Sequence, residues 1–240
     1  MNIALLTAAG CGSRMGQDIP KQFMTIDDCP VIIYTMFPFQ NHPNIDLIAV
    51  VCLKGWEVSL RAYANQYGIT KLKYIFPGGE TNQASIHNGI VGLKKEGFSD
   101  DDIVLIQDGV RPLVSSDIIS NNISVCSRYG YAITGLKCKE VVMEYVPSND
   151  TLSYLSIPRE RLVRTHTPHT YKLGIILNLH KIAENEGLDM VASCELAAKL
   201  GVNDQHLVIG TEKNGLKLTN VEDIELFKAL KNVSSYPWLK

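Results

Sequence analysis

The fold is decided near the start of the chain, by the stretch NIALLTAAGCGSRMGQDIPKQ at residues 2–22. Its first part, Ile3–Thr7, is almost continuously apolar, which is typical of a parallel strand that is covered on both faces. After this strand, Gly10 and Gly12 let the backbone turn tightly and bring peptide N–H groups close to a ligand. Arg14 and Lys21 add fixed positive charge beside the turn. Backbone donors and two cations after a buried strand predict a triphosphate site.

Two common glycine motifs do not fit this stretch. A Walker A loop requires Gly-Lys followed by Ser or Thr, but Gly16 is followed by Gln17. A dinucleotide fingerprint requires a third glycine where Met15 stands. A glycine turn without a ligand remains an alternative for Gly10 and Gly12 taken alone.

The rest of the chain alternates short apolar runs with helical patterns. Strands are predicted at Ile3–Thr7, Leu47–Cys52, Leu72–Phe76, Ile103–Gln107, Tyr131–Leu136 and His206–Ile209, and helices at Val31–Phe37, Trp56–Tyr67, Thr81–Lys95, Ser116–Tyr129, Leu173–Asn185, Val191–Leu200 and Val221–Leu230. We expect Thr81 and Ser116 to act as N-caps. Repeated β-α-β units predict an α/β fold with a doubly wound, mostly parallel sheet. We expect one domain over residues 1–240, with a protruding β-arm at about 137–165 whose end overlaps a basic stretch at 159–169.

Composition narrows the class of protein. The 240 residues carry a net charge of −2, which argues against a broad nucleic-acid surface, so an anionic ligand requires a local cluster of cations. No apolar run approaches the roughly 20 residues of a membrane span, and the N-terminus is expected to be a buried strand rather than a signal peptide. The six cysteines form no CxxC pair, which favours free, mostly buried thiols and a cytoplasmic location.

The run AAGCGSRMGQDIPKQ at residues 8–22 closely resembles the signature of the 2-C-methyl-D-erythritol 4-phosphate cytidylyltransferase family, including its ribitol-5-phosphate branch. The wider glycosyltransferase-A-like nucleotidyltransferases, with a Rossmann-like fold, carry looser versions. The resemblance implies transfer of CMP from CTP to a small polyol phosphate. It also implies nucleotide contacts from Ala8, Ala9, Gly10 and Gly12, and catalytic roles for Arg14 and Lys21 at the triphosphate.

A second motif, PGGETNQASI at residues 77–86, joins a strand end to a helix start, where backbone N–H groups can bind the edge of a base. The resemblance implies that Gly79 and Ser85 bind the cytosine. Asn82 departs from the family, which usually has arginine there. The alternative is that Thr81 merely caps a helix.

A third motif is Gln107–Pro112, at the end of an apolar strand. Asp108 is the predicted Mg²⁺ ligand, because a hard cation needs oxygen ligands beside phosphates. Asp108, Arg111 and Pro112 match the family's His-Asp-x-x-Arg-Pro, whereas Gln107 departs from it. Asp108 and Arg111 are predicted to contact the acceptor as well; the alternative is a local ion pair.

Acceptor binding is implied for two further residues. An arginine at the position of Arg159 grips the acceptor's phosphate in the family and reaches in from the partner subunit, which implies a homodimer built on the β-arm. Thr167 matches the family's Thr-Pro, but His166 and His169 stand where glutamines usually flank that pair. A solvated basic stretch is the alternative.

The last motif is Asn214–Thr219, which resembles the family's Asn-x-Lys-x-Thr with one extra residue. It places Lys217 at the α-phosphate of CTP as a third catalytic cation; a surface lysine is the alternative. The acceptor's phosphate is already ionised at pH 7, so the reaction needs cations and alignment more than a general base.

The departures gather on the acceptor side. Val141 and Ala192 replace a threonine and an acid of the family pattern, while the nucleotide side is nearly complete. We therefore predict ribitol 5-phosphate, or a relative of it, as the acceptor. Methylerythritol phosphate, a uridylyltransferase of the same fold and an inactive nucleotide-binding protein remain alternatives.

Overall fold

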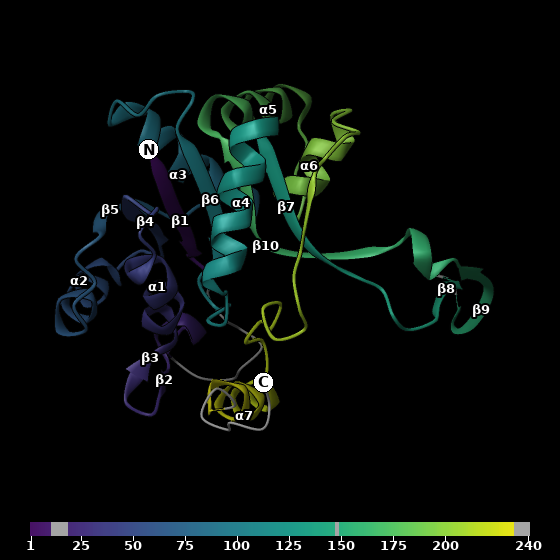
Figure 1. The fold of residues 1–240 in the computed structure, drawn as a ribbon, viewed down its shortest axis with the longest axis horizontal. Helices are drawn as coiled ribbons and strands as arrows, with labels where there is room; N and C mark the ends of the chain where they lie inside the picture. The colour runs from purple at the N-terminus through teal and green to yellow at the C-terminus, as the bar shows by residue number, and fades with distance from the viewer. Residues whose placement is uncertain (11–18, 147–148, 233–240) are drawn as a thin grey trace.

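A seven-stranded, mostly parallel sheet forms the centre of the protein, with helices on both faces (Figure 1). The computed structural model describes residues 1–10, 19–146 and 149–232. The strand order is β11-β7-β10-β6-β1-β4-β5. This confirms the predicted fold class.

The parallel half of the sheet consists of β1 (Asn2–Ala8), β4 (Leu47–Cys52), β5 (Leu72–Pro77) and β6 (Ile103–Asp108). All six residues of β4 are buried, because helices cover both faces of the strand. In the register, Thr7 pairs with Asp108, Ala8 with Cys52, and Cys52 with Pro77. The carboxyl ends of these four strands therefore meet along one edge, where α/β sheets bind ligands.

Each face of the sheet is covered by its own set of helices. The helices α1 (Val31–Asn41), α2 (Glu57–Gln66) and α4 (Ser116–Tyr129) pack against one face. The other face is covered by α3 (Asn82–Lys95), α5 (Leu173–Glu186) and α6 (Ser193–Lys199). Alternate β1 side chains divide between the two cores, Leu6 in the first and Leu5 in the second.

One of the two predicted helix caps is confirmed. Thr81 caps α3 by accepting a hydrogen bond from the Ala84 N–H at 3.1 Å. The prediction of Ser116 as the cap of α4 is wrong by one residue, because the neighbouring Ser115 accepts from the Ile118 N–H at 3.3 Å. Gly130 ends α4 in the left-handed conformation at φ 87°, which glycine adopts without strain.

The strand β10 (Val163–Lys172) was not predicted from the sequence. It lies antiparallel between β6 and β7 (Tyr131–Lys137), and β11 (Leu207–Ile209) adds to the far edge of β7. Its sequence is too polar to resemble a core strand, yet Thr170 is fully buried and donates a hydrogen bond to the Asn122 side chain at 3.0 Å. Most of the basic stretch at 159–169, for which a solvated segment was the alternative, therefore lies in a central strand.

A hairpin of β8 (Val142–Val146) and β9 (Asn149–Ile157) projects away from the sheet in Figure 1. Smaller elements are the β2–β3 hairpin (Thr25–Ile26 and Cys29–Pro30) and the 3-10 helices η2 (Lys21–Phe23) and η3 (Arg159–Arg161). The last helix, α7 (Val221–Asn232), packs Phe227 against Tyr34 of α1. In the described ranges, no helix is both long enough and apolar enough to cross a membrane.

Candidate functional site

The start of the glycine loop is held by a buried amide. Gln22, 2% exposed, donates hydrogen bonds from Nε2 to the carbonyls of Ala8 at 2.9 Å and Gly10 at 3.0 Å. Both loop carbonyls are therefore tied to η2, which also carries Lys21. Gln22 belongs to the quoted motif, but the sequence suggested no role for it. The predicted residues Gly12 and Arg14 lie outside the described residues.

The turn after β5 requires glycine at two positions. A Cβ atom on Gly78 would lie 2.5 Å from the Cβ of Ala9, and one on Gly79 would lie 2.6 Å from the Cβ of Ala84. The Gly79 N–H donates to the Ser85 hydroxyl at 3.0 Å, and Ser85 is buried at the start of α3. The turn therefore packs closely between the glycine loop and the first turn of α3.

These elements enclose a first cavity of ≈ 340 Å³. Every described residue that was predicted to contact the nucleotide lines it: Ala8, Ala9, Gly10, Lys21, Gly79, Ser85, Asp108 and Lys217. The structure thus brings together residues from five separate parts of the sequence.

Three charged side chains meet at the end of β6. The Oδ2 atom of Asp108 lies 2.9 Å from Arg111 Nε and 3.0 Å from Lys217 Nζ. Burial raises the pKa of Asp108, but the charges of Lys217 and Arg111 outweigh it and lower that pKa to about 2. Asp108 is therefore an anion at neutral pH. The local ion pair considered from the sequence exists, and it includes Lys217.

A second cavity, of ≈ 520 Å³, continues from the first. Thr7, Gly10, Asn82, Asp108 and Lys217 line both cavities. The second cavity adds residues from β10 and from the segment that leads into the start of α6: Thr165, His166, Thr167, His169, Val191, Ala192 and Ser193. The predicted acceptor-binding residues Asp108, Arg111 and Thr167 all line it. The Thr167 hydroxyl accepts a hydrogen bond from the Asp108 N–H at 3.0 Å, which fixes β10 to the end of β6.

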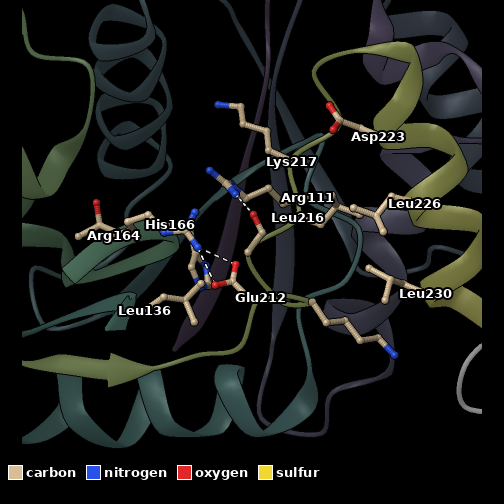
Figure 2. Close-up of a pocket in the computed structure, with 13 residues that line it drawn as sticks. Arg111, Leu136, Arg164, His166, Glu212, Leu216, Lys217, Asp223, Leu226 and Leu230 are labelled. Atoms are coloured by element: carbon tan, nitrogen blue, oxygen red, sulfur yellow. Dashed lines mark hydrogen bonds and ion pairs between the residues drawn. The ribbon is translucent and has the colours of Figure 1, made fainter. Parts of the chain in front are cut away.

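A third cavity, of ≈ 570 Å³, opens between Lys217, β10 and α7. Figure 2 shows Arg111 and Lys217 on one side of it and Leu226 and Leu230 of α7 on another. At the β10 side, Arg164 forms an ion pair with Glu212 at 2.6 Å. Arg111 is anchored by donating a hydrogen bond to the Gly215 carbonyl.

Arg159 lies apart from this cluster in the single chain. It belongs to η3, which follows the projecting hairpin, and it lines none of the three cavities. Its guanidinium donates to the Lys139 carbonyl and lies 3.8 Å from Glu160. The structure of one chain therefore does not bring Arg159 to the other predicted site residues.

Asp108 is the predicted metal ligand. Among residues 1–10, 19–146 and 149–232, no group of three His, Cys, Asp or Glu side chains could hold a metal ion. One carboxylate is nevertheless a common protein contribution to Mg²⁺ that is bound mainly by substrate phosphates and water. The residues present fit a metal ion that arrives with a nucleotide, and they do not form a closed protein site.

Comparison with known proteins shows which family and which solved structures this chain is similar to. The family model described as 2-C-methyl-D-erythritol 4-phosphate cytidylyltransferase matches residues 2–231. The chain is 38% identical to a ribitol-5-phosphate cytidylyltransferase of Lacticaseibacillus paracasei, over 95% of this chain and 97% of that protein. It is also 38% identical to a ribitol-5-phosphate cytidylyltransferase of Vibrio parahaemolyticus, over 96% and 95%. The crystal structure of the 4-diphosphocytidyl-2C-methyl-D-erythritol synthase of Anaerococcus prevotii has a similar fold, with a TM-score of 0.80 at 20% identity over 96% of each chain.

Proposed function

We infer that this chain, which belongs to the 2-C-methyl-D-erythritol 4-phosphate cytidylyltransferase family, is a CTP-dependent nucleotidyltransferase that transfers CMP to a polyol phosphate. For the acceptor we propose ribitol 5-phosphate or a close relative. The observation that carries this choice is the near full-length 38% identity to two ribitol-5-phosphate cytidylyltransferases. Family membership also favours an enzyme over an inactive nucleotide-binding protein.

The proposed reaction is an in-line displacement at the α-phosphorus of CTP. An oxygen of the acceptor's phosphate forms the new P–O bond, the bond from the α-phosphorus to the bridging oxygen breaks, and pyrophosphate leaves with that oxygen. No proton has to be removed from the ionised nucleophile. The main barrier is the approach of two anions, so cations placed before the reaction supply most of the stabilisation.

The first cavity suits the nucleotide. Gly10 and Lys21 lie where the triphosphate would pass, and Lys217 lies where the two cavities meet, beside the proposed α-phosphate position. Gly79 and Ser85 at the other wall would bind the cytosine. Their mutual hydrogen bond of 3.0 Å holds this wall in place before any ligand arrives.

Magnesium is proposed as the cofactor. Asp108 would hold it together with oxygens of the triphosphate, and the ion would neutralise part of the phosphate charge. The low pKa of Asp108, about 2, keeps this carboxylate ionised over the whole physiological range. Its two cationic neighbours also align it toward the junction of the cavities.

A panel of substrates tests the proposal. Pyrophosphate release should be measured with CTP, UTP, ATP and GTP, each with ribitol 5-phosphate, methylerythritol phosphate and other short polyol phosphates. We expect CTP with ribitol 5-phosphate or a close relative to give the highest kcat/KM. Methylerythritol phosphate as the best acceptor by a wide margin would contradict the acceptor, and a preference for UTP would contradict the nucleotide.

We also propose that the active form is a homodimer built on the β8–β9 hairpin. Apolar side chains on or beside this hairpin are exposed: Val141 at 71%, Met143 at 50% and Leu155 at 57%. A partner chain that covers them would bring its Arg159 toward this chain's acceptor cavity. The five described cysteines are free thiols, four of them buried, which supports a reducing compartment such as the cytoplasm.

Subunit mixing tests the role of Arg159. A Lys21→Ala protein and an Arg159→Ala protein should each be inactive, but a mixture should recover part of the activity, because some heterodimers contain one complete site. Lack of recovery after subunit exchange, verified by mass spectrometry of differently tagged chains, would contradict action across the interface.

A further inference from the structure

Two buried polar atoms in the second cavity have no hydrogen-bond partner among the residues that the structure describes. His169 and Ser193 are each 4% exposed and line this cavity from β10 and from the start of α6. Neither His169 Nε2 nor Ser193 Oγ has a hydrogen-bond partner within the described part of the chain. Buried polar atoms are nearly always hydrogen-bonded in folded proteins, so a ligand in this cavity is the expected partner.

The neighbouring His166 differs from this pair. Its Nε2 atom is also unpartnered, but a Cβ atom on Gly210 would lie 2.8 Å from it. Its Nδ1 atom lies 3.0 Å from the Thr167 carbonyl. His166 therefore packs under the chain that follows β11, and we exclude it from the ligand-binding pair.

The chemistry of the pair indicates what it binds. Burial lowers the pKa of His169 to about 4, so the imidazole is neutral at pH 7, with one N–H donor and one acceptor. The serine hydroxyl likewise donates and accepts. Two neutral groups of this kind match a hydroxyl, which also does both, and they offer no charge to a phosphate.

The charged groups lie elsewhere in the same cavity. Arg111 and Lys217, both bound to Asp108, provide the positive charge that a phosphate requires. The cavity thus has a cationic part for the phosphate and a neutral hydrogen-bonding part. The segment before α6 is fixed against α3, because the Asn82 side chain donates to the Val191 carbonyl at 2.9 Å.

We propose that His169 and Ser193 together bind a hydroxyl group on the acceptor's carbon chain and thereby select the polyol phosphate that this enzyme uses. This rests on the proposed function, because it assumes that a polyol phosphate occupies the second cavity. A carbon chain without a hydroxyl at that position would leave both side chains buried and unpaired, which disfavours such an acceptor.

The test compares ribitol 5-phosphate with its singly deoxygenated analogues at saturating CTP. For wild type, we expect kcat/KM to fall about 10- to 100-fold for the analogue that lacks the bound hydroxyl. His169→Phe keeps a ring of similar shape but removes both nitrogen atoms. It should abolish discrimination against that one analogue and keep the remaining preferences, with the KM for CTP within about twofold of wild type.

Two further variants complete the experiment. Ser193→Ala should reduce discrimination against the same analogue. If His169→Phe does not fold, Ser193→Ala tests the inference by itself. The control His206→Phe makes the same exchange one residue ahead of β11, and it should keep wild-type discrimination. If both cavity variants lower kcat/KM equally for all acceptors, or leave the ratios unchanged, the inference is wrong and the proposed function stands. If wild type uses no polyol phosphate with CTP, the proposed function fails and the inference fails with it.

Discussion

Replacing Gly10 by alanine should separate nucleotide binding from folding. Among the described residues, no atom lies within 4 Å of the position that a Cβ atom on Gly10 would take, and the backbone there is not left-handed. The new methyl group should therefore meet no steric clash with the described part of the chain. A Gly→Ala change at a compatible position stabilises by about 0.4–1 kcal/mol, because it restricts the unfolded chain.

The same methyl group should weaken CTP binding. Gly10 lines the first cavity, where the proposed triphosphate approaches the backbone closely. A Cβ atom there would hold the phosphate away from the peptide N–H groups. A hydrogen bond to a charged group contributes about 1.5–3 kcal/mol, so loss of one such contact should raise the Kd for CTP about 10- to 100-fold.

Gly79 provides the matched control. A Cβ atom there would lie 2.7 Å from the Ala84 carbonyl carbon and 2.9 Å from the Ser85 nitrogen, and this backbone cannot move aside as a side chain could. Gly79→Ala should therefore lower the free energy of unfolding by about 1–3 kcal/mol, as overpacking typically does. It should also weaken CTP binding.

Urea unfolding followed by circular dichroism measures stability, and calorimetric titration with CTP and Mg²⁺ measures affinity. We expect Gly10→Ala to be at least as stable as wild type but to bind CTP poorly, and Gly79→Ala to lose both properties. A Gly10→Ala protein that binds CTP within twofold of wild type would refute the close approach of the triphosphate. A Gly79→Ala protein as stable as wild type would refute the packing argument.

Three other predictions follow from the site. Lys21→Ala should lower kcat about 10²- to 10³-fold with an unchanged circular dichroism spectrum, since it removes a cation from the transition state; a near-normal kcat would contradict this. Asp108→Asn should raise the Mg²⁺ concentration needed for half-maximal activity, because an amide is a poor ligand for a hard cation; an identical titration would rule out the role. Burial lowers to about 4 the pKa values of His169 in β10 and of His180, which is buried in α5 outside the site, so each imidazole resists protonation in the folded protein. The stability that each neutral histidine contributes should be present above pH 6.5 and lost as the pH falls to about 4, on the order of 3 kcal/mol each. Urea titrations across this range should show the loss, with a smaller slope for His180→Phe; an equal slope would contradict the contribution of His180.

The parallel half of the sheet could be predicted because the burial of its strands can be recognised in their own sequences. Strand β4 is buried on both faces, so its sequence is a continuous apolar run with visible ends. Strand β10 is also central, but its inward positions include Thr170 and His169, which are buried as polar side chains. Thr170 is satisfied by Asn122, a residue 48 positions away that no local pattern identifies.

The site residues can likewise be divided into those that the sequence predicts and those that only the structure identifies. The proposed roles of Lys21 and Asp108 depend on charge and could be predicted from residue type and position after a strand, whereas the proposed role of Gly79 came from the family resemblance. The role of Gln22 could not be predicted, because it depends on where the Ala8 and Gly10 carbonyls lie in three dimensions. Ser193 became a candidate only once burial showed that its hydroxyl lacks a partner.

The Asp108 carboxylate connects the two proposed subsites. Without ligands it binds Arg111 and Lys217, the cations that the proposal assigns to substrate phosphates. A nucleotide that arrives with Mg²⁺ would offer Asp108 a stronger cation and Lys217 a stronger anion, so both could exchange partners at little cost. Lys217 is 42% exposed and has room to turn. Substitution of Asp108 or Lys217 should therefore change the KM values for CTP and acceptor together, whereas Gly10→Ala should raise the KM for CTP more than the KM for the acceptor.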